Sequence, residues 1–385
     1  MKQITRTIPF RLILLVFVFV SFQFKNPKKG VDNSAVLEPI LPLDKIKLPK
    51  GFKIELFATG LEGARSMCVG EKGTIFVGTQ KGKVYAVQDT NNDFVADKVY
   101  TIAKGLVMPN GVAFRNGTLY VAEVSRIIKF QNIESKLENP PTPQVVYDKF
   151  PSKKHHGWKY IAFGPDGKLY VPVGAPCNVC ESEDDIFATM TRMNPDGSGM
   201  EIFARGIRNS VGFTWHPDTK EMWFTDNGRD MLGDDIPPCE LNRASQKGMH
   251  FGYPYWHGGD VKDPKFGDKF PQENFQKPAQ NLGAHVAPLG LKFYTGKTFP
   301  IVYRKQIFIA EHGSWNRSEK SGYKISLVKT KANGMTSYET FAEGWLDYQS
   351  QKAWGRPVDI LILKDGSMLV SDDKAGVIYR IYYKG

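Results

Sequence analysis

Residues 73–87, GTIFVGTQKGKVYAV, begin at a glycine, run through alternating large apolar side chains, and break at Gly78 and Gly82 before apolar residues resume. Alternation with a period of two is typical of a β-strand, and glycine marks tight turns. The stretch therefore predicts short strands separated by a turn rather than a helix.

Five further segments repeat this pattern, each starting at a turn residue or a charge and breaking at Gly, Asp or Glu. Phe76 and its five aromatic or apolar counterparts follow one another at intervals of 44, 50, 53, 85 and 61 residues. Short strands recurring at such a period are typical of a β-propeller, and no window sustains the apolar period of a helix. We therefore predict an all-β, six-bladed β-propeller. The five segments are GTLYVAEVSRIIKF (117–130), GKLYVPVG (167–174), KEMWFTDNG (220–228), KQIFIAEHG (305–313) and GSMLVSDDKAGVIYRI (366–381).

The longest interval, between the fourth and fifth repeats, contains a stretch rich in glycine, proline and aromatic residues, HFGYPYWHGGDVKDPKFGDKFPQENF (250–275). We expect it to form a large loop over one face of a propeller domain that spans 49–385. The inner strands of a propeller converge on a central channel, so residues next to separate repeats meet at its mouth. This mouth is the expected functional site.

The N-terminus has the features of an exported protein. Residues 1–24 combine a basic head with an apolar run over 12–20 that is too short to span a bilayer comfortably. They predict a signal peptide or a retained N-terminal anchor. Residues 25–48, with scattered Pro and Lys, are interpreted as a linker. We expect a periplasmic or extracellular protein, with a membrane tether as the alternative if the leader is not cleaved.

The formal charge of +11 does not indicate nucleic-acid binding. Residues 1–30 contain six basic residues and no acidic one, which leaves 45 basic and 40 acidic residues in the rest of the chain. That remainder has no long Lys/Arg run of the kind that follows phosphates. Nucleic acid is therefore excluded as the partner.

Four cysteines fit an oxidising compartment without forming a disulfide framework. Cys177 and Cys180 have the CxxC spacing but lie in a Pro/Gly loop after a strand, so we expect a structural disulfide, local or between loops. A zinc site would need a second CxxC or a histidine pair at ligand spacing, and the sequence has neither. The pairing of Cys68 and Cys239 stays open.

Arginines stand at comparable places in different repeats. Arg205 and Arg208 precede a predicted strand, Arg229 follows the next one, and Arg356 precedes an inner strand of the last repeat. Guanidinium groups stay charged and pair with carboxylates in a bidentate way, so converging arginines predict a pocket for a polyanion. A lone exposed arginine more often forms a surface ion pair.

Several separated motifs then occur in one order: His156 eight residues ahead of GPDG (164–167), RNSVG (208–212), DNGR (226–229) with ELN (240–242), and GRPVD (355–359). Together they resemble the soluble quinoprotein glucose/sorbosone dehydrogenase family, most closely its sorbosone and pyranose dehydrogenase branch. The resemblance covers roughly residues 50–383. It implies a six-bladed propeller that holds pyrroloquinoline quinone (PQQ) and Ca²⁺ at the channel mouth. Electrons would pass from a sugar to an external acceptor, a quinone or a cytochrome.

The resemblance also implies residue roles. His156 matches the general base that takes the proton of the substrate hydroxyl, and Arg208 matches the arginine that stabilises negative charge on the cofactor's reactive carbonyl. Gly228 and Arg229 match the positions whose backbone carbonyls hold Ca²⁺, a cation that prefers oxygen ligands, and Arg229 counts as a cofactor contact as well. Ala175 replaces a carboxylate that would orient the base, so His156 needs another partner.

Five further positions correspond to places around the cofactor or the substrate. Arg356 matches a ligand of its carboxylates, Asn110 falls close to a polar channel residue, and His312 lies near the place of a cofactor lysine. His155 stands where the glucose-specific group has an acid, and Val358 replaces a second cofactor arginine. These departures argue against glucose as the specific substrate.

Three other features keep two interpretations each. Asp234 and Asp235 either bind a second Ca²⁺ or belong to a solvated acidic loop. Residues 89–97, DTNNDFVAD, alternate oxygen-bearing side chains like a calcium loop but lack Gly at the sixth position. Trp315 and Trp354 either stack on a sugar ring or pack within blades.

Two functions compete with a PQQ-dependent dehydrogenase that oxidises a sorbosone-type aldehyde or a pyranose hydroxyl. A calcium-dependent lactonase on a six-bladed propeller needs Glu, Asn and Asp side chains converging from several blades, whereas the channel-facing positions here are richer in Arg and His. A non-enzymatic propeller that binds peptide or glycan explains the repeats but not the converging arginines.

Overall fold

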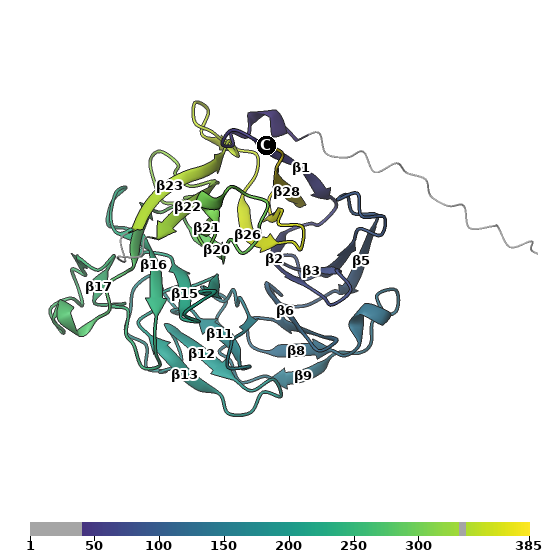
Figure 1. Ribbon diagram of the computed structural model, residues 1–385. Coiled ribbons are helices and arrows are strands. Elements are labelled where there is room, and N and C mark those ends of the chain that lie inside the picture. The colour runs from purple at the N-terminus through teal and green to yellow at the C-terminus, as the bar shows by residue number, and fades with distance from the viewer. Residues whose placement is uncertain (1–40, 331–335) are drawn as a thin grey trace, which may run out of the picture. The chain divides into compact units, whose positions relative to one another are not determined.

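The computed structural model describes residues 41–330 and 336–385. The predicted leader at 1–24 and the larger part of the predicted linker lie outside these residues. Six four-stranded antiparallel sheets surround a central channel (Figure 1). They are the six blades of a β-propeller, which confirms the fold predicted from the repeats.

In each of the first five blades the strands follow one another in chain order from the channel outward. These blades consist of β2 (Ala64–Val69), β3 (Ile75–Thr79), β4 (Val84–Gln88) and β5 (Lys98–Ala103); β6 (Gly111–Arg115), β7 (Thr118–Ala122), β8 (Ile127–Phe130) and β9 (Gln144–Tyr147); β10 (Ala162–Phe163), β11 (Leu169–Val173), β12 (Thr189–Met193) and β13 (Glu201–Arg205); β14 (Phe213–Trp215), β15 (Met222–Asp226), β16 (Pro238–Ala244) and β19 (Gln280–Ala284); and β20 (Pro288–Phe293), β21 (Ile307–Glu311), β22 (Lys324–Thr330) and β23 (Thr336–Glu343).

The sixth blade joins the two ends of the described chain. Its inner strands are β26 (Pro357–Ile362), β27 (Met368–Asp372) and β28 (Val377–Tyr383), and its outermost strand is β1 (Phe52–Ala58), in register from Phe52 opposite Tyr383. The Asp359 carboxylate of this blade accepts the backbone N–H of Met67 in the first blade at 2.8 Å. The ring is therefore closed by pairing between segments far apart in the sequence.

The apolar repeats form the second strand of every blade. All five residues of β3, β11, β15, β21 and β27 are buried, because other blades cover both faces of these strands. Aromatic rings fill the wedges between blades; the Phe52 ring meets those of Phe299 and Phe341 edge to face at 4.7 and 5.0 Å. Truncating such a ring, as in Phe308→Ala, would cost about 3–5 kcal/mol.

The inner strands approach one another so closely that glycine is required. A Cβ on Gly111 would lie 2.1 Å from the carbonyl oxygen of Lys159, and one on Gly212 would lie 2.1 Å from that of Leu289. Any larger residue would push neighbouring blades apart. The glycine of the RNSVG motif therefore has a packing role at the edge of the channel.

The insertion at 250–275 lies at the outer edge of the propeller. Its hairpin, β17 (Trp256–His257) and β18 (Val261–Lys262), projects away from the channel in Figure 1. His250 forms a parallel bridge with Arg205, so the insertion is anchored on the third blade. The sequence predicts that this stretch forms a large loop over one face, but its hairpin lies at the periphery of the propeller (Figure 1).

The last residues of the predicted linker contact the propeller. Leu43–Lys45 form a 3-10 helix, Ile46 is buried in the core of the fifth and sixth blades, and Lys47 bridges Glu343. Three more single-turn 3-10 helices occur, at Ile133–Ser135, Gln272–Asn274 and Ile301–Tyr303, besides the hairpin β24 (Leu346–Asp347) with β25 (Lys352–Ala353). Across the described residues, no helix has the length and apolarity needed to cross a membrane.

Candidate active site

One face of the propeller gathers two kinds of segment: the connections that lead into the inner strands, and the loops between the second and third strands. Between them lies a cavity of about 710 Å³ with lining residues next to all six blades. Its floor is an apolar cluster of Val211, Leu289 and Val358, against which Trp158 packs. Val358, which replaces a cofactor arginine of the family, thus helps to close the channel beneath the cavity.

His156 reaches the cavity from the connection between β9 and β10. Its backbone has φ +50°, and its Cβ would clash at 2.6 Å with a Cβ on Gly174, so the glycine at the end of β11 makes room for it. Nδ1 lies 2.9 Å from the carbonyl oxygen of Ala175. A carbonyl accepts only, so Nδ1 carries the proton and Nε2 keeps its lone pair. The family resemblance implies a carboxylate side chain at position 175 as the partner of this histidine. Here the backbone carbonyl of Ala175 makes that contact instead.

His156 is neutral over the physiological pH range. Burial lowers its pKa to about 2, and the positive charge of Arg208 and the ring of His155 act in the same direction. The exposed His155 ring stands 4.0 Å from that of His156, centroid to centroid. Its unprotonated Nε2 is able to accept a proton, but a pKa this low makes the imidazole a weak base. The negative charge of a bound ligand is needed to raise that pKa towards neutrality.

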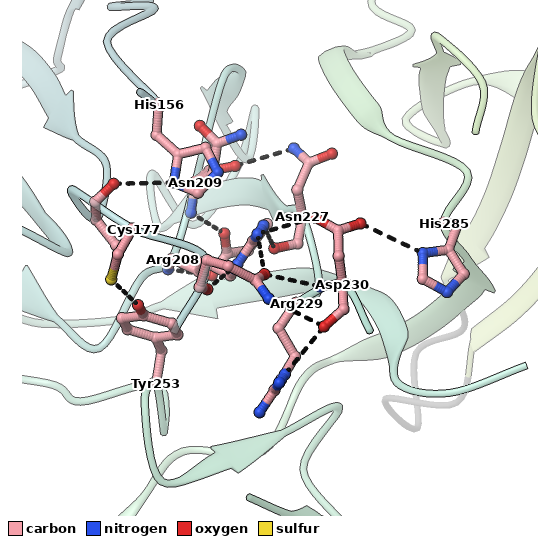
Figure 2. Close-up of polar contacts among 12 residues, drawn as sticks. His156, Cys177, Arg208, Asn209, Asn227, Arg229, Asp230, Tyr253 and His285 are labelled. Atoms are coloured by element: carbon pink, nitrogen blue, oxygen red, sulfur yellow. Dashed lines mark hydrogen bonds and ion pairs between the residues drawn. The ribbon is translucent and has the colours of Figure 1, made fainter. Parts of the chain in front are cut away.

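Arg208 lies next to His156, on the connection between β13 and β14 (Figure 2). Its guanidinium donates to the carbonyl and to the side-chain oxygen of Asn178, both at 2.8 Å, and to the carbonyl of Asn227 at 3.1 Å. Asp230 approaches it at 3.3 Å. The Asp226 carboxylate accepts a hydrogen bond from the backbone N–H of Arg208 at 2.8 Å. The buried cation is thus locked in one orientation at the edge of the cavity.

Arg356 enters from the segment before β26. Its guanidinium donates to the carbonyl oxygens of His312 and Gly313, both at 3.1 Å, and lies over the ring of Tyr323. Among the described residues no carboxylate forms an ion pair with it. The negative charge of Asp373 acts on it only at longer range, so its guanidinium lines the cavity without a direct carboxylate partner.

Arg65, the second residue of β2, supplies a third guanidinium. It pairs with Asp373 at 2.7 Å, donates to Oδ1 of Asn110 at 2.6 Å and stacks on Trp158 at 4.6 Å. Asn110 is fully buried and does not line the cavity, so its observed contact is with the arginine. His312 lines the cavity and bonds Asp373 at 2.8 Å, and burial lowers its pKa to about 4.

The predicted calcium positions lie in the loop between β15 and β16. Gly228 lines the cavity, and within the described residues neither its carbonyl oxygen nor that of Arg229 accepts a hydrogen bond. The Arg229 side chain is turned away from the cavity and pairs with Asp263. Backbone oxygens at this loop are therefore available to a hard cation.

Asp234 and Asp235 lie farther along the same loop and outside the cavity. Asp235 pairs with Arg317 at 2.9 Å, and Asp234 accepts the backbone N–H of Ser318 at 3.1 Å. Within the described ranges no group of three or more His, Cys, Asp or Glu side chains is arranged to hold a metal ion. These two acids instead join the loop to the one that follows β21.

The structure also shows the contacts of the 89–97 loop and of the two tryptophans, for which the sequence allows two interpretations each. In the 89–97 loop the carboxylates of Asp89 and Asp97 accept backbone N–H groups of the loop itself. Trp354 packs in the sixth blade, where its indole N–H donates to the carbonyl of Gly344 at 2.7 Å. Trp315 lines the cavity and is 71% exposed, so it stands free at the rim.

Cys177 and Cys180 form a local disulfide, which confirms the structural bridge expected from the CxxC spacing. Cys68 and Cys239 are free thiols, and burial raises the pKa of Cys239 to about 11. Neither free thiol is reactive by its environment, because the nucleophilic form is the thiolate.

Three residues of the site were missed from the sequence. Arg65 had a detectable signal, because it begins an inner strand just as Arg208 and Arg356 precede theirs. Asn178 lies between the two cysteines of the CxxC motif, whose spacing indicates a disulfide but assigns no role to the residues inside it. His285 precedes β20; Asp230 at 3.7 Å raises its pKa, and its Nε2 donates to the carbonyl of Gly233 at 2.8 Å (Figure 2).

Comparison with known proteins identifies a matching family and several relatives. The model of the TrAA12-like family matches residues 46–255 and 238–384. An uncharacterized protein of Borreliella burgdorferi is 38% identical over 353 residues, which cover 88% of this chain and 91% of that one. A pyrroloquinoline quinone-dependent pyranose dehydrogenase of Coprinopsis cinerea is 30% identical over 236 residues, 47% of this chain and 31% of that enzyme.

Among solved structures, the calcium structure of the Trichoderma reesei carbohydrate-active enzyme of family AA12 superposes with a TM-score of 0.76. The match covers 88% of this chain and 97% of that one at 20% identity. At this identity the likeness shows the fold, and it agrees with the six blades described above.

Proposed function

The chain belongs to the TrAA12-like family, and on that premise we propose that it is a PQQ-dependent sugar dehydrogenase with its active site in the cavity at the channel mouth. The Coprinopsis relative is named for this cofactor and for pyranose oxidation. The observation that supports the proposal best is the convergence of Arg65, Arg208 and Arg356 from separate blades around the neutral His156.

The cavity suits PQQ in size and charge. Its volume of about 710 Å³ falls within the range of about 300–1,000 Å³ that is usual for small-molecule sites. PQQ is a flat quinone with several carboxylates, and a guanidinium pairs with a carboxylate through two parallel hydrogen bonds. Arg356 is the candidate for that contact because, among the described residues, no carboxylate forms an ion pair with it.

Ca²⁺ is the cation we place beside the cofactor, with the carbonyl oxygens of Gly228 and Arg229 as its protein ligands. Bound PQQ would supply a quinone able to take up a hydride, and Ca²⁺ would supply a Lewis acid beside it. Calcium prefers oxygen ligands and tolerates irregular geometry, so backbone carbonyls completed by ligand oxygens suit it.

His156 supplies the base. Nε2 takes the proton of the sugar hydroxyl, while the Nδ1–H bond to Ala175 keeps the ring in the required tautomer. Arg208, held by Asn178 and Asn227, stabilises negative charge that develops on the acceptor oxygen. The apolar floor of Val211, Leu289 and Val358 closes the cavity from below. The substrate is a sugar with a pyranose hydroxyl or a sorbosone-type aldehyde, the latter oxidised as its hydrate, which presents a hydroxyl to Nε2.

The proposed location is the periplasm or the extracellular space, with the electrons passing to an external quinone or cytochrome through the mouth. The Cys177–Cys180 disulfide supports this location because such bonds persist in oxidising compartments. A tether through 1–24 stays part of the proposal.

The test combines binding and turnover of the purified apoprotein. PQQ is titrated by absorbance with and without Ca²⁺, and dye-linked oxidation is measured over a panel of aldoses, pyranoses and sorbosone. We expect saturable, Ca²⁺-dependent binding and PQQ-dependent oxidation of at least one sugar. His216→Ala, in the turn between β14 and β15 and not among the residues that line the cavity, should behave like the wild type. Absence of PQQ binding, or lactone hydrolysis without PQQ, would refute the proposal.

A further inference from the structure

A small loop closed by a disulfide lies beside Arg208. Cys177 and Cys180 are bonded within the connection between β11 and β12, so the ring contains Asn178 and Val179 between them. Tyr253, from the segment after β16, holds the same loop from outside: its hydroxyl accepts the N–H of Cys180 at 3.1 Å and lies 3.4 Å from Sγ of Cys177 (Figure 2).

Asn178 makes four hydrogen bonds, two with Arg208 and two with Asp230. Its backbone carbonyl accepts Nε of Arg208 and its side-chain oxygen accepts Nη2, both at 2.8 Å. The same side chain accepts the N–H of Asp230 at 2.9 Å and donates to the carbonyl of Asp230 at 3.1 Å. Asn178 therefore fixes Arg208 and, at the same time, the loop that carries Gly228.

We propose that Asn178 is the positioning residue for Arg208 and that the Cys177–Cys180 disulfide makes this positioning depend on the redox state of the protein. The backbone and the side chain of Asn178 must face Arg208 together, which demands one conformation of the loop. A disulfide across two residues allows few conformations, whereas the open loop regains freedom that ordering must again remove. The consequence for PQQ rests on the function proposed above; the hold on Arg208 does not.

The redox step is a thiol–disulfide exchange with a dithiol. The thiolate of the dithiol attacks one of the two sulfurs and forms a mixed disulfide, and its second thiol then releases the protein. The protein gains two electrons and two protons as thiols of Cys177 and Cys180, and the dithiol becomes a disulfide. Both cysteines are partly exposed, and Cys180 lines an open cavity next to the mouth, so a small dithiol can reach the bond.

The first readout needs no cofactor. Exchange of the Arg208 Nε–H with water is followed by NMR on ¹⁵N-labelled apoprotein, with the signal assigned by its absence from Arg208→Ala. We expect exchange at least tenfold faster in Asn178→Ala and in wild-type protein reduced with dithiothreitol. Cys68→Ser, which removes a thiol outside the cavity, should exchange like the wild type. Unchanged exchange, once a thiol count shows that the disulfide is open, would overturn the proposal.

The second readout is PQQ affinity after the reductant has been removed without oxygen. We expect at least tenfold weaker binding for reduced wild type, for Cys177→Ser/Cys180→Ser and for Asn178→Ala. The double serine variant also excludes direct reaction of new thiols with the quinone, and dithiothreitol should not affect it. In an Arg208→Ala background, Asn178→Ala should cost much less affinity than in the wild type, because only its hold on the Gly228 loop is left to lose. An equal loss in both backgrounds would mean that Asn178 does not act through Arg208. If the wild type itself does not bind PQQ, the proposed function fails and the exchange rates alone decide.

Discussion

The central channel contains buried polar groups at two levels, and they differ in how completely they are paired. Farther along the inner strands than the apolar floor, Lys292 donates to the hydroxyl of Tyr160 at 2.7 Å, and Asp359 accepts the amides of Met67 and Ile360, both at 2.8 Å. At the mouth, His156 keeps Nε2 free and Arg356 has carbonyl partners but, among the described residues, no acid.

This difference separates structural from functional polar groups. The deeper groups are paired across blades: Lys292 and Tyr160 join the fifth blade to the segment that leads into the third, and Asp359 joins the sixth blade to Met67 in the first. Such pairing is what buried polar groups show in a stable core. The groups at the mouth are held rigidly by the backbone yet retain unused donor or acceptor capacity. A ligand of complementary charge is the partner that would complete them.

The largest expected effect is that of His156→Ala. Loss of the base should lower kcat about 100- to 10,000-fold while PQQ affinity changes little, because Arg65, Arg208 and Arg356 remain. Stopped-flow reduction of bound PQQ measures the step directly. His155→Ala, which removes the exposed neighbouring ring, serves as the control and should cost less than about tenfold. Equal losses in the two variants would show that His156 is not the base.

Asp359→Ala tests the deeper level. It removes the acceptor of two buried amides and leaves Lys292 without a nearby negative charge, so unfolding free energy should fall by about 2–4 kcal/mol. Urea unfolding measures the loss. PQQ affinity of the folded variant should match that of the wild type. A loss of PQQ affinity without a loss of stability would show that Asp359 serves the binding site and not the core.

Arg356→Ala should have the opposite profile. PQQ binding is expected to weaken about 10- to 100-fold because a charge-assisted pair is lost. Unfolding free energy should fall by less than about 2 kcal/mol, since two carbonyl contacts and the contact with the Tyr323 ring are removed. Arg356→Lys keeps the charge and should recover part of the affinity. Absorbance titration measures the PQQ affinity and urea unfolding measures the stability. A stability loss as large as that of Asp359→Ala would contradict the prediction.

The smallest effect concerns pH. Burial lowers the pKa of His312 to about 4, below its ordinary value of about 6.5 in the unfolded chain. Below pH 6.5 the unfolded chain therefore binds a proton that the native state refuses, so this histidine reduces stability as pH falls from 6.5 towards 4. Relative to His312→Asn, the wild type should lose about 1–2 kcal/mol between pH 7.5 and 5. Urea unfolding at both pH values gives the difference; a constant gap would mean that His312 is not buried neutral.

Much of the fold and part of the site were predictable because they depend on local patterns. The alternation in residues 73–87 and its five repeats predicts the blades, since each second strand must present apolar residues on both faces. Arg208, His156 and Arg356 were found because they precede inner strands, and the same rule applied to Arg65 would have added it. The motif series also pointed to the correct family.

The residue types do not reveal which group each polar side chain contacts in the folded protein. The sequence alone determined a six-bladed, all-β propeller with arginines and histidines at one mouth, because strand period and motif order are local properties. Tertiary structure alone decided that β1 closes the last blade, that the carbonyl of Ala175 replaces a missing carboxylate, and that Asn178 holds Arg208. Backbone groups are the same in every residue, so which carbonyl faces which side chain is determined only when distant blades come together.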